Sequence, residues 1–245
     1  MRQTTRRIWV LALLALVAGC GYLGGDDDPQ GWPDVDFGVP VEVYRDTDTR
    51  PLHVHLFQPD PAPTQPAGAV LFFHGGGFAT TRLHQFEPQA AAVASAGMVG
   101  IVVEYRVSGD GVDRDHSIDD GRAAVAWIRT NADRLGIDPH RIALAGASAG
   151  GYLVTNADAD PDAYVLFNPA VSAQVAARSE DAPTIVFHSR ADTIVAFADA
   201  ENYCNAEPDC QLVAYDTGDH GFFNNGDAYT DTLNHTIKFL TTHGW

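Results

Sequence analysis

The stretch RIALAGASAGG, residues 141–151, decides the fold class more than any other part of the sequence. Its first half is a short apolar run typical of a buried strand, and its second half contains a Gly-x-Ser-x-Gly pattern. A strand that turns sharply into a helix at Ser148 would strain the backbone there and expose the hydroxyl, while glycines two residues either side relieve the crowding. The start of the helix would present free N–H groups to an anion that forms at the serine.

The rest of the chain alternates between short apolar runs and helical patterns. The predicted strands cover residues 52–58, 69–73, 98–105, 141–146, 164–169, 184–189 and 210–215, and the longest predicted helices cover residues 85–97, 117–136 and 228–244. Strands that alternate with helices predict an α/β domain with a mainly parallel central sheet flanked by helices. Functional sites in such sheets form where the strands end, at the carboxyl edge.

Two further polar residues follow strands at this predicted edge. Asp192 comes just after the strand at 184–189, and His220 lies on the loop beyond the strand at 210–215. A serine hydroxyl is a poor nucleophile unless a base takes its proton, which an imidazole can do near neutral pH. A carboxylate can then hold the ring in the right tautomer and stabilise the imidazolium. The chain order Ser148, Asp192, His220 therefore predicts a catalytic triad.

The segment HGGGFATT, residues 74–81, follows another predicted strand and lies at the same edge. Attack on a carbonyl carbon creates an oxyanion, which backbone N–H groups can stabilise, and glycines let the backbone come close enough to do so. We expect Gly76, Gly77 and the N–H of Ala149 to form an oxyanion hole. The alternative is a flexible glycine-rich turn without a function.

Together these motifs resemble the hormone-sensitive-lipase-like group of α/β-hydrolase serine esterases. The resemblance covers roughly residues 40–245 and rests on FFHGGGF, VVEYR, the long run from SIDDGRA to GASAGG, VLFNPAV, HSRADTIV and GDHGFFN. VLFNP and HGFFN look most similar to bacterial acetyl or carbohydrate esterases. The resemblance implies Ser148 as nucleophile, His220 as base and then acid, and Asp192 as the residue that orients His220.

The resemblance also assigns supporting positions and shows one departure. It implies that His74 braces the oxyanion loop and that Tyr105, Arg106 and Asp120 give structural support, while His116, His188 and Glu104 are expected to be scaffold positions. Family members usually carry a cap before the strand that bears the acid. Only VSAQVAARSEDAP stands there in this chain, so we expect a reduced or absent cap and an open site.

The N-terminal residues predict export rather than folded structure. Residues 1–20 combine a basic start, a short apolar run and VAGC, which is similar to a bacterial lipoprotein signal with Cys20 as the lipidated residue. The alternative is a plain secretory peptide, and TRRIWV leaves twin-arginine export open. Residues 21–38 are rich in Gly, Asp and Pro and are expected to form an acidic tether. The catalytic domain is then predicted over residues 39–245.

Two remaining cysteines fit an oxidising compartment. Cys204 and Cys210 lie six positions apart and could close a small disulfide loop between a helix and the next strand. Two unpaired thiols are the alternative.

Composition limits the partners and cofactors. A net charge of −17, from 32 acidic and 15 basic residues, argues against nucleic acid, which needs a basic patch. His53 and His55 alternate on one strand, but without a third ligand by pattern we expect exposed strand residues rather than a metal site. No metal or cofactor is predicted.

The sequence therefore predicts a serine carboxylesterase for short, acetyl-type esters, on carbohydrate among other carriers, anchored in the bacterial envelope through Cys20. Its predicted partners are the ester substrate and the membrane that holds the lipid. The alternatives are a peptidase, lactonase or thioesterase on the same triad, or a non-catalytic surface binding protein that retains the fold.

Overall fold

A computed structural model describes residues 35–171 and 182–245 of the chain. The predicted signal at 1–20, the lipidation site Cys20 and most of the predicted tether lie outside the described residues. Val35 and Phe37, at the end of that tether, pack against the hydrophobic core, and the Phe37 ring lies 4.9 Å from the His55 ring. The folded unit therefore includes residues 35–38, four residues more than the predicted domain boundary.

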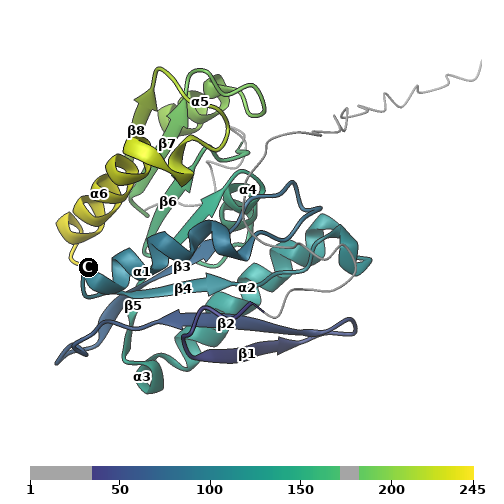
Figure 1. Ribbon diagram of the computed structural model, residues 1–245, viewed down its shortest axis with the longest axis vertical. Helices are drawn as coiled ribbons and strands as arrows, with labels where there is room; N and C mark the ends of the chain where they lie inside the picture. The colour runs from purple at the N-terminus through teal and green to yellow at the C-terminus, as the bar shows by residue number, and fades with distance from the viewer. Residues whose placement is uncertain (1–34, 172–181) are drawn as a thin grey trace, which may run out of the picture. The chain divides into compact units, whose positions relative to one another are not determined.

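One sheet of eight strands runs through this unit in the order β1-β2-β4-β3-β5-β6-β7-β8 (Figure 1). The strands are β1 (Val41–Asp46), β2 (Pro51–Phe57), β3 (Ala67–Phe73), β4 (Val99–Val103), β5 (Ile137–Ala147), β6 (Ala163–Phe167), β7 (Thr184–Ser189) and β8 (Cys210–Tyr215). The pairs β1–β2 and β2–β4 are antiparallel, and every later pair is parallel. This is the mainly parallel sheet that the apolar runs predict.

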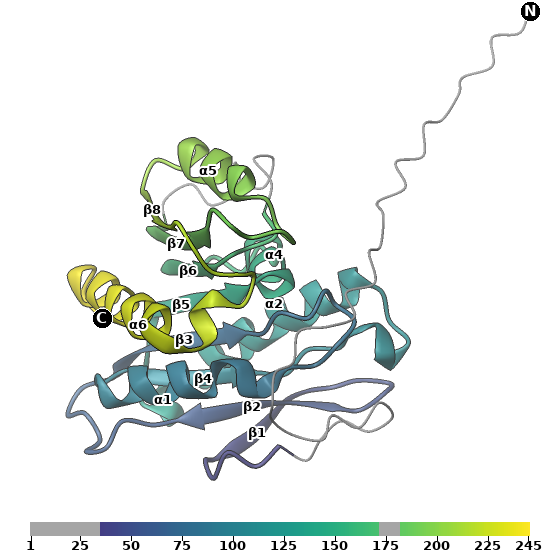
Figure 2. The ribbon, with the colours of Figure 1, turned by 45° about the horizontal axis from the view of Figure 1, so that its top comes forward.

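Helices cover both faces of the sheet (Figures 1 and 2). They are α1 (Glu87–Ser95), α2 (Arg114–Thr130), α3 (Ala132–Leu135), α4 (Ala149–Asn156), α5 (Phe197–Ala206) and α6 (Gly226–Thr242). Helices α1 and α6 pack on one face over a core rich in phenylalanine, and α2 packs with α4 against the other face. Helix α5 lies against β7 and β8 (Figure 2).

The helix predicted over 117–136 differs from the observed one in its start and its continuity. Helix α2 begins three residues earlier, because the Asp113 side chain accepts from the N–H groups of Asp115 and His116 and caps the first turn. The helix is interrupted at Asn131, and the short helix α3 that follows is capped by Gly136, whose φ is 69°. The predicted glycine stop is therefore present.

The expectation that His53 and His55 are exposed is wrong for His55. That residue is 2% exposed, and the Phe37 ring packs edge-on against its ring at 4.9 Å. Its Nε2 lies 3.1 Å from Oε1 of Glu104, and Nδ1 of His53 lies 3.2 Å from Oε2 of the same carboxylate. The two histidines pair with a buried carboxylate.

A disulfide joins Cys204, on α5, to Cys210, at the start of β8. The β6–β7 connection, where we expect the reduced cap, includes residues 172–181, which lie outside the described residues. In the part of the chain that the structure describes, no helix has the length and apolar character needed to cross a bilayer.

Candidate active site

Ser148 sits at the turn between β5 and α4, with φ 51° and ψ −115°. A non-glycine residue at positive φ is strained, and the surrounding backbone holds it in place. The Ser148 N–H donates to the carbonyl of Phe167 at 3.1 Å, and its carbonyl accepts from the N–H of Ala170 at 3.0 Å. The predicted sharp strand-to-helix turn is therefore anchored to the end of β6.

The glycines around Ser148 are there because the turn is crowded. A Cβ at Gly146 would lie 2.5 Å from the Gly150 backbone, and one at Gly150 would lie 2.1 Å from the carbonyl oxygen of Phe73. A Cβ at Gly151 would meet Pro169 at 2.5 Å. These contacts are shorter than any side chain tolerates, so the turn can approach β3 and β6 only with glycine at these positions.

His220 and Asp192 meet at the carboxyl edge of the sheet, as the loop positions predict. Nδ1 of His220 lies 2.7 Å from Oδ2 of Asp192, whose side chain is fully buried. The other carboxylate oxygen accepts from the N–H groups of Ile194 at 2.8 Å and Val195 at 3.1 Å. Both oxygens of the acid are therefore held, and the ring is tied to it through Nδ1.

The charge on Asp192 is stabilised in place. Burial alone would raise the pKa of this carboxyl, but the hydrogen bonds from His188 and His220, with two backbone N–H groups, outweigh burial and hold the pKa well below its usual range. Asp192 is thus ionised at neutral pH, which is the form that can orient and stabilise an imidazolium.

His188 is a contact of Asp192 that the sequence did not single out as functional. It is fully buried, and its Nε2 lies 3.1 Å from the Val195 carbonyl and 3.4 Å from Oδ2 of Asp192. A carbonyl only accepts, so Nε2 of His188 carries the proton. His188 and His220 therefore approach the same carboxylate oxygen.

Asn168 is a second residue that the sequence analysis left without a role. Its side-chain Nδ2 lies 2.9 Å from Nδ1 and 3.1 Å from Nε2 of His220. Within the described residues, Ser148 Oγ makes no hydrogen bond, so no hydrogen bond joins Ser148 to His220 in this structure. The position of Asn168 right after β6 was the available signal, because Ser148 and Asp192 also follow strand ends.

The glycine loop lies directly against the serine turn. A Cβ at Gly75 would lie 3.4 Å from Cβ of Ser148, and the Gly75 N–H is already used by Oε1 of Gln85 at 2.7 Å. Gly76 and Gly77 have φ values of 122° and 64°, and in the described residues their N–H groups have no acceptor. The N–H of Ala149, in the first turn of α4, likewise lacks an intrahelical acceptor.

His74 and Tyr105 brace this loop from behind. The two rings stack with centroids 4.4 Å apart, and the Tyr105 hydroxyl donates to the His74 carbonyl at 2.7 Å. Nδ1 of His74 contacts the Gly75 carbonyl. Burial lowers the pKa of His74 to about 4, so the ring is neutral at pH 7. The observed contacts are those of a structural brace.

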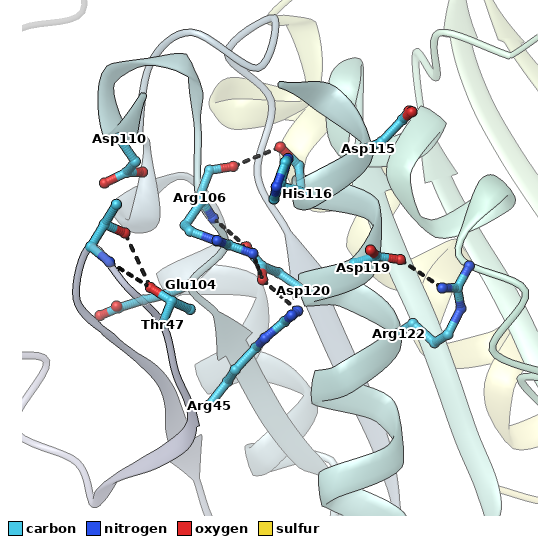
Figure 3. A network of polar contacts seen from close by, with 12 residues as sticks. Arg45, Thr47, Glu104, Arg106, Asp110, Asp115, His116, Asp119, Asp120 and Arg122 are labelled. Atoms are coloured by element: carbon cyan, nitrogen blue, oxygen red, sulfur yellow. Dashed lines mark hydrogen bonds and ion pairs between the residues drawn. The ribbon is translucent and has the colours of Figure 1, made fainter. Parts of the chain in front are cut away.

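Arg106, in the segment after β4, forms an ion pair with Asp120 on α2 (Figure 3). The buried Asp120 accepts from the Arg106 side chain at 2.8 and 2.9 Å, from the Arg106 N–H at 3.0 Å and from Arg45 at 2.7 Å. These bonds tie α2 to β1 and to the segment after β4. His116, by contrast, is exposed and pairs with Asp113 at the start of α2.

In residues 35–171 and 182–245, no group of three or more His, Cys, Asp or Glu side chains has an arrangement that could hold a metal ion.

Comparison with known proteins places the chain in a family. A family profile described as alpha/beta hydrolase fold matches residues 70–200, more than half of the chain. The chain belongs to this α/β-hydrolase family. The match spans the glycine loop, the serine turn and the acid.

Its relatives include several esterases. It is 42% identical over 83 residues to carboxylesterase NlhH of Mycobacterium tuberculosis, covering 34% of this chain and 26% of NlhH. It is 31% identical over 169 residues to esterase LipC of the same organism, covering 62% of this chain and 39% of LipC. The chain thus spans well under two thirds of these two relatives.

The solved structure of Thermogutta terrifontis esterase 2 phosphoramylated by tabun resembles the chain over more of its length. The TM-score is 0.79 at 28% identity, with 87% of this chain and 98% of that one covered. A butyrate-bound form of the same esterase gives a TM-score of 0.77 at 27% identity, covering 85% of this chain and 95% of that one.

Proposed function

We propose that this protein is a serine carboxylesterase in which Ser148, His220 and Asp192 form the triad. The observation that carries the proposal is the glycine loop packed on the serine turn, with Gly75 against Ser148 and two N–H groups of the loop that find no acceptor among the described residues. A serine beside N–H groups that have no acceptor suits a reaction that builds negative charge on an oxygen. The similarity to known esterases also supports this function.

In the proposed reaction, Nε2 of His220 takes the proton of Ser148 Oγ as this oxygen bonds to the ester carbonyl carbon. The carbonyl oxygen becomes an oxyanion and accepts from the N–H groups of Gly76, Gly77 and Ala149. His220 then gives its proton to the leaving alcohol, the carbon–alkoxide bond breaks, and an acyl-serine remains. Water, deprotonated by the same ring, repeats the sequence and releases the acid.

We further propose that the protein hydrolyses esters of short acyl groups, acetyl above all, and that carbohydrate is one of the alcohols that carry them. The short connection between the end of β6 and β7 supports a reduced cap, which leaves room for a bulky alcohol and little surface to bury a long chain. The Thermogutta esterase, solved with butyrate, supports a short acyl group by analogy. A strong preference for long-chain esters would contradict this part.

Hydrolysis of p-nitrophenyl acetate, butyrate and octanoate by the purified full chain tests both parts. We expect rapid acetate and butyrate cleavage, slow octanoate cleavage, and a loss of at least about 10³-fold in Ser148→Ala. Ser95→Ala is the matched control, because the Ser95 hydroxyl is exposed and bonds only within α1. An unchanged turnover rate in Ser148→Ala would contradict the assignment of Ser148 as the nucleophile.

Hydrolysis rates for amide, lactone and thioester substrates of similar size test the alternatives of a peptidase, a lactonase and a thioesterase. A fluorophosphonate that labels nucleophilic serines tests the alternative of a non-catalytic binding protein. Labelling would exclude that alternative, because a serine that is not activated does not react with the probe. We expect labelling in the wild-type protein and none in Ser148→Ala.

We also propose that the protein is held in the bacterial envelope by a lipid on Cys20, with residues 21–34 leading to the folded unit. Support comes from the basic, apolar and VAGC segments of residues 1–20. Incorporation of labelled palmitate in the wild-type protein, and its absence in Cys20→Ser, is the expected result. An unlabelled wild-type protein released into the medium would favour a plain secretory signal.

A further inference from the structure

Phe78 directly follows Gly76 and Gly77, the two glycines proposed for the oxyanion hole, and it has a backbone conformation that bulky residues rarely adopt. Its φ is 60°, and its carbonyl accepts from the N–H of Ser108 at 2.8 Å. Positive φ strains a residue that has a Cβ, and such strain is concentrated at functional sites. The Phe78 side chain is half-buried, so part of its ring remains accessible beside the candidate site.

Tyr152 brings a second aromatic ring to the same place. It lies one helical turn after Ser148, and its N–H donates to the Ser148 carbonyl at 3.1 Å. The rings of Phe78 and Tyr152 meet edge to face, with their centroids 6.0 Å apart. Tyr152 is also half-buried, and its hydroxyl has no hydrogen-bonding partner in the described part of the chain. Two partly exposed rings therefore bridge the glycine loop and the serine turn.

Arg114, the first residue of α2, lies over the Tyr152 ring, with 4.7 Å between its guanidinium carbon and the ring centroid. This cation–π contact positions the charge without neutralising it. Among the described residues, Arg114 has no ion-pair partner and no acceptor for its guanidinium N–H groups. Its neighbours Asp113 and Asp115 do not face it, because adjacent residues of a helix point in different directions. Asp113 instead accepts from N–H groups of the first turn and contacts the His116 ring.

An arginine without a carboxylate partner is unusual in this acidic chain. The sequence has 32 acidic and 15 basic residues, and most of the described arginines pair with a carboxylate. Among the described arginines, the only other one that neither pairs nor donates is Arg82, at the end of the glycine loop. Besides burial, the charge of Arg82 lowers the pKa of His74. Charges are screened over about 8 Å at physiological ionic strength, so these nearby guanidiniums affect a bound group more than distant acidic residues do.

We propose that Phe78, Tyr152 and Arg114 form a subsite for the alcohol part of the substrate, and that this alcohol is a sugar acid whose carboxylate binds Arg114. The charge belongs to the alcohol, because an acetyl-type acyl group carries none. A guanidinium matches a carboxylate with two parallel N–H donors. The two rings and the Tyr152 hydroxyl offer contacts to the apolar and hydroxyl groups of the sugar. The inference rests on the proposed esterase function and names the class of ester.

Acetate release from matched sugars tests the preference for a charged alcohol. Methyl glucuronide and methyl glucoside, acetylated at the same ring hydroxyl with each position tried in turn, differ only in a carboxylate against a hydroxymethyl group. We expect kcat/KM at low salt to be about fivefold higher for the acidic sugar, the size of effect that exposed ion pairs give. The preference should disappear as the screening length falls from about 30 Å at about 0.01 M salt to about 3 Å at about 1 M. A wild-type protein without this preference at any position would overturn the proposal.

Substitutions at Arg114 and Tyr152 separate the charge from the ring that holds it. Arg114→Gln should remove the preference for the acidic sugar, and Arg114→Lys should keep part of it, because the charge remains without the planar fork. Tyr152→Leu should weaken the preference and Tyr152→Phe should keep it, because the cation–π contact needs the ring and not the hydroxyl. The matched control is Arg134→Gln, since Arg134 is exposed, lies over the Trp127 ring at 5.6 Å and pairs with Glu42. An unchanged preference in Arg114→Gln would overturn the proposal.

Binding of the alcohol alone makes a second test that does not depend on the esterase reaction. Methyl glucuronide and methyl glucoside carry no ester, so NMR titrations of the full chain with each sugar measure the subsite directly. We expect the glucuronide to bind about fivefold more tightly to the wild-type protein, and both sugars to bind equally to Arg114→Gln. Equal binding to the wild-type protein would overturn the subsite. A wild-type protein that prefers the glucuronide but hydrolyses no ester would retain the subsite and contradict the proposed function.

Discussion

The hydroxyl of Tyr105 donates to the backbone carbonyl of His74 at 2.7 Å, and the two rings stack 4.4 Å apart. This contact joins the segment after β4 to the glycine loop after β3. The loop has little side-chain surface of its own to pack, so its position beside Ser148 depends on such bonds from neighbouring strands. The same pair therefore affects both the folded state and the proposed oxyanion hole.

Replacing Tyr105 with phenylalanine should separate these two effects. The change leaves a buried carbonyl without its donor and should lower the free energy of unfolding by about 1–2 kcal/mol. We expect kcat for p-nitrophenyl acetate to fall several-fold, because the loop loses its support. Tyr44→Phe is the matched control, since the buried Tyr44 hydroxyl donates to the Glu104 carbonyl at 2.6 Å. An equal loss of kcat in both variants would contradict a specific role of Tyr105 at the loop.

Gly150→Ala should destabilise the serine turn severely. The added methyl would lie 2.1 Å from the carbonyl oxygen of Phe73 and 2.5 Å from that of His74, so α4 or β3 has to move. We expect a loss of more than about 3 kcal/mol in urea unfolding and little soluble, active protein. Gly109→Ala is the control, because its nearest neighbour would be Val107 at 4.0 Å. A folded, active Gly150→Ala protein would show that the turn tolerates expansion.

Glu104 should make the stability depend on pH in the acid range. Burial alone would raise the pKa of Glu104, but the bonds from His55 and Arg50 outweigh it and lower the pKa to about 2. A carboxyl with a lowered folded-state pKa stabilises the protein above its unfolded pKa of about 4.5, and this contribution is lost as the pH falls toward 2. The shift corresponds to about 3 kcal/mol.

Urea unfolding at pH 7 and pH 3 for the wild-type protein and Glu104→Gln measures this contribution. We expect the variant to be less stable at pH 7, with the difference shrinking at pH 3, because Glu104 of the unfolded chain is protonated there while Glu104 of the folded protein is still mostly ionised. Glu87→Gln removes an exposed carboxylate that also pairs with a histidine, and it should change little at either pH. A constant difference between wild type and Glu104→Gln at the two pH values would disprove the linkage.

His188→Leu should reduce activity through Asp192. The substitution removes the Nε2–H donor that bonds the Val195 carbonyl and approaches Oδ2 of Asp192, so the acid is held less firmly against His220. We expect kcat/KM to fall about tenfold, with partial recovery in His188→Gln, whose amide can donate to the same carbonyl. Full activity in His188→Leu would show that the bonds from Ile194 and Val195 position Asp192 without help.

The sequence by itself determined the sheet apart from its edge strand β1, which no predicted strand covers, together with the serine turn and the order of the candidate residues. Buried parallel strands need near-continuous apolar runs, and the loops that follow them must meet at one edge. Ser148, Asp192 and His220 could therefore be placed together from local patterns, and the sharp turn at Ser148 could be predicted from the glycines at 146 and 150.

Only the tertiary structure decided what touches the candidate residues. Asn168 meets His220, and His188 meets Asp192, because separate strand ends converge at the carboxyl edge, and no local pattern encodes such distances. His55 is buried because Phe37 packs against its ring and Glu104 pairs with it, and alternation along one strand does not reveal such contacts with distant segments. Strand and turn formation depends on the residues nearby in the chain, whereas hydrogen-bonding partners depend on which strands become neighbours.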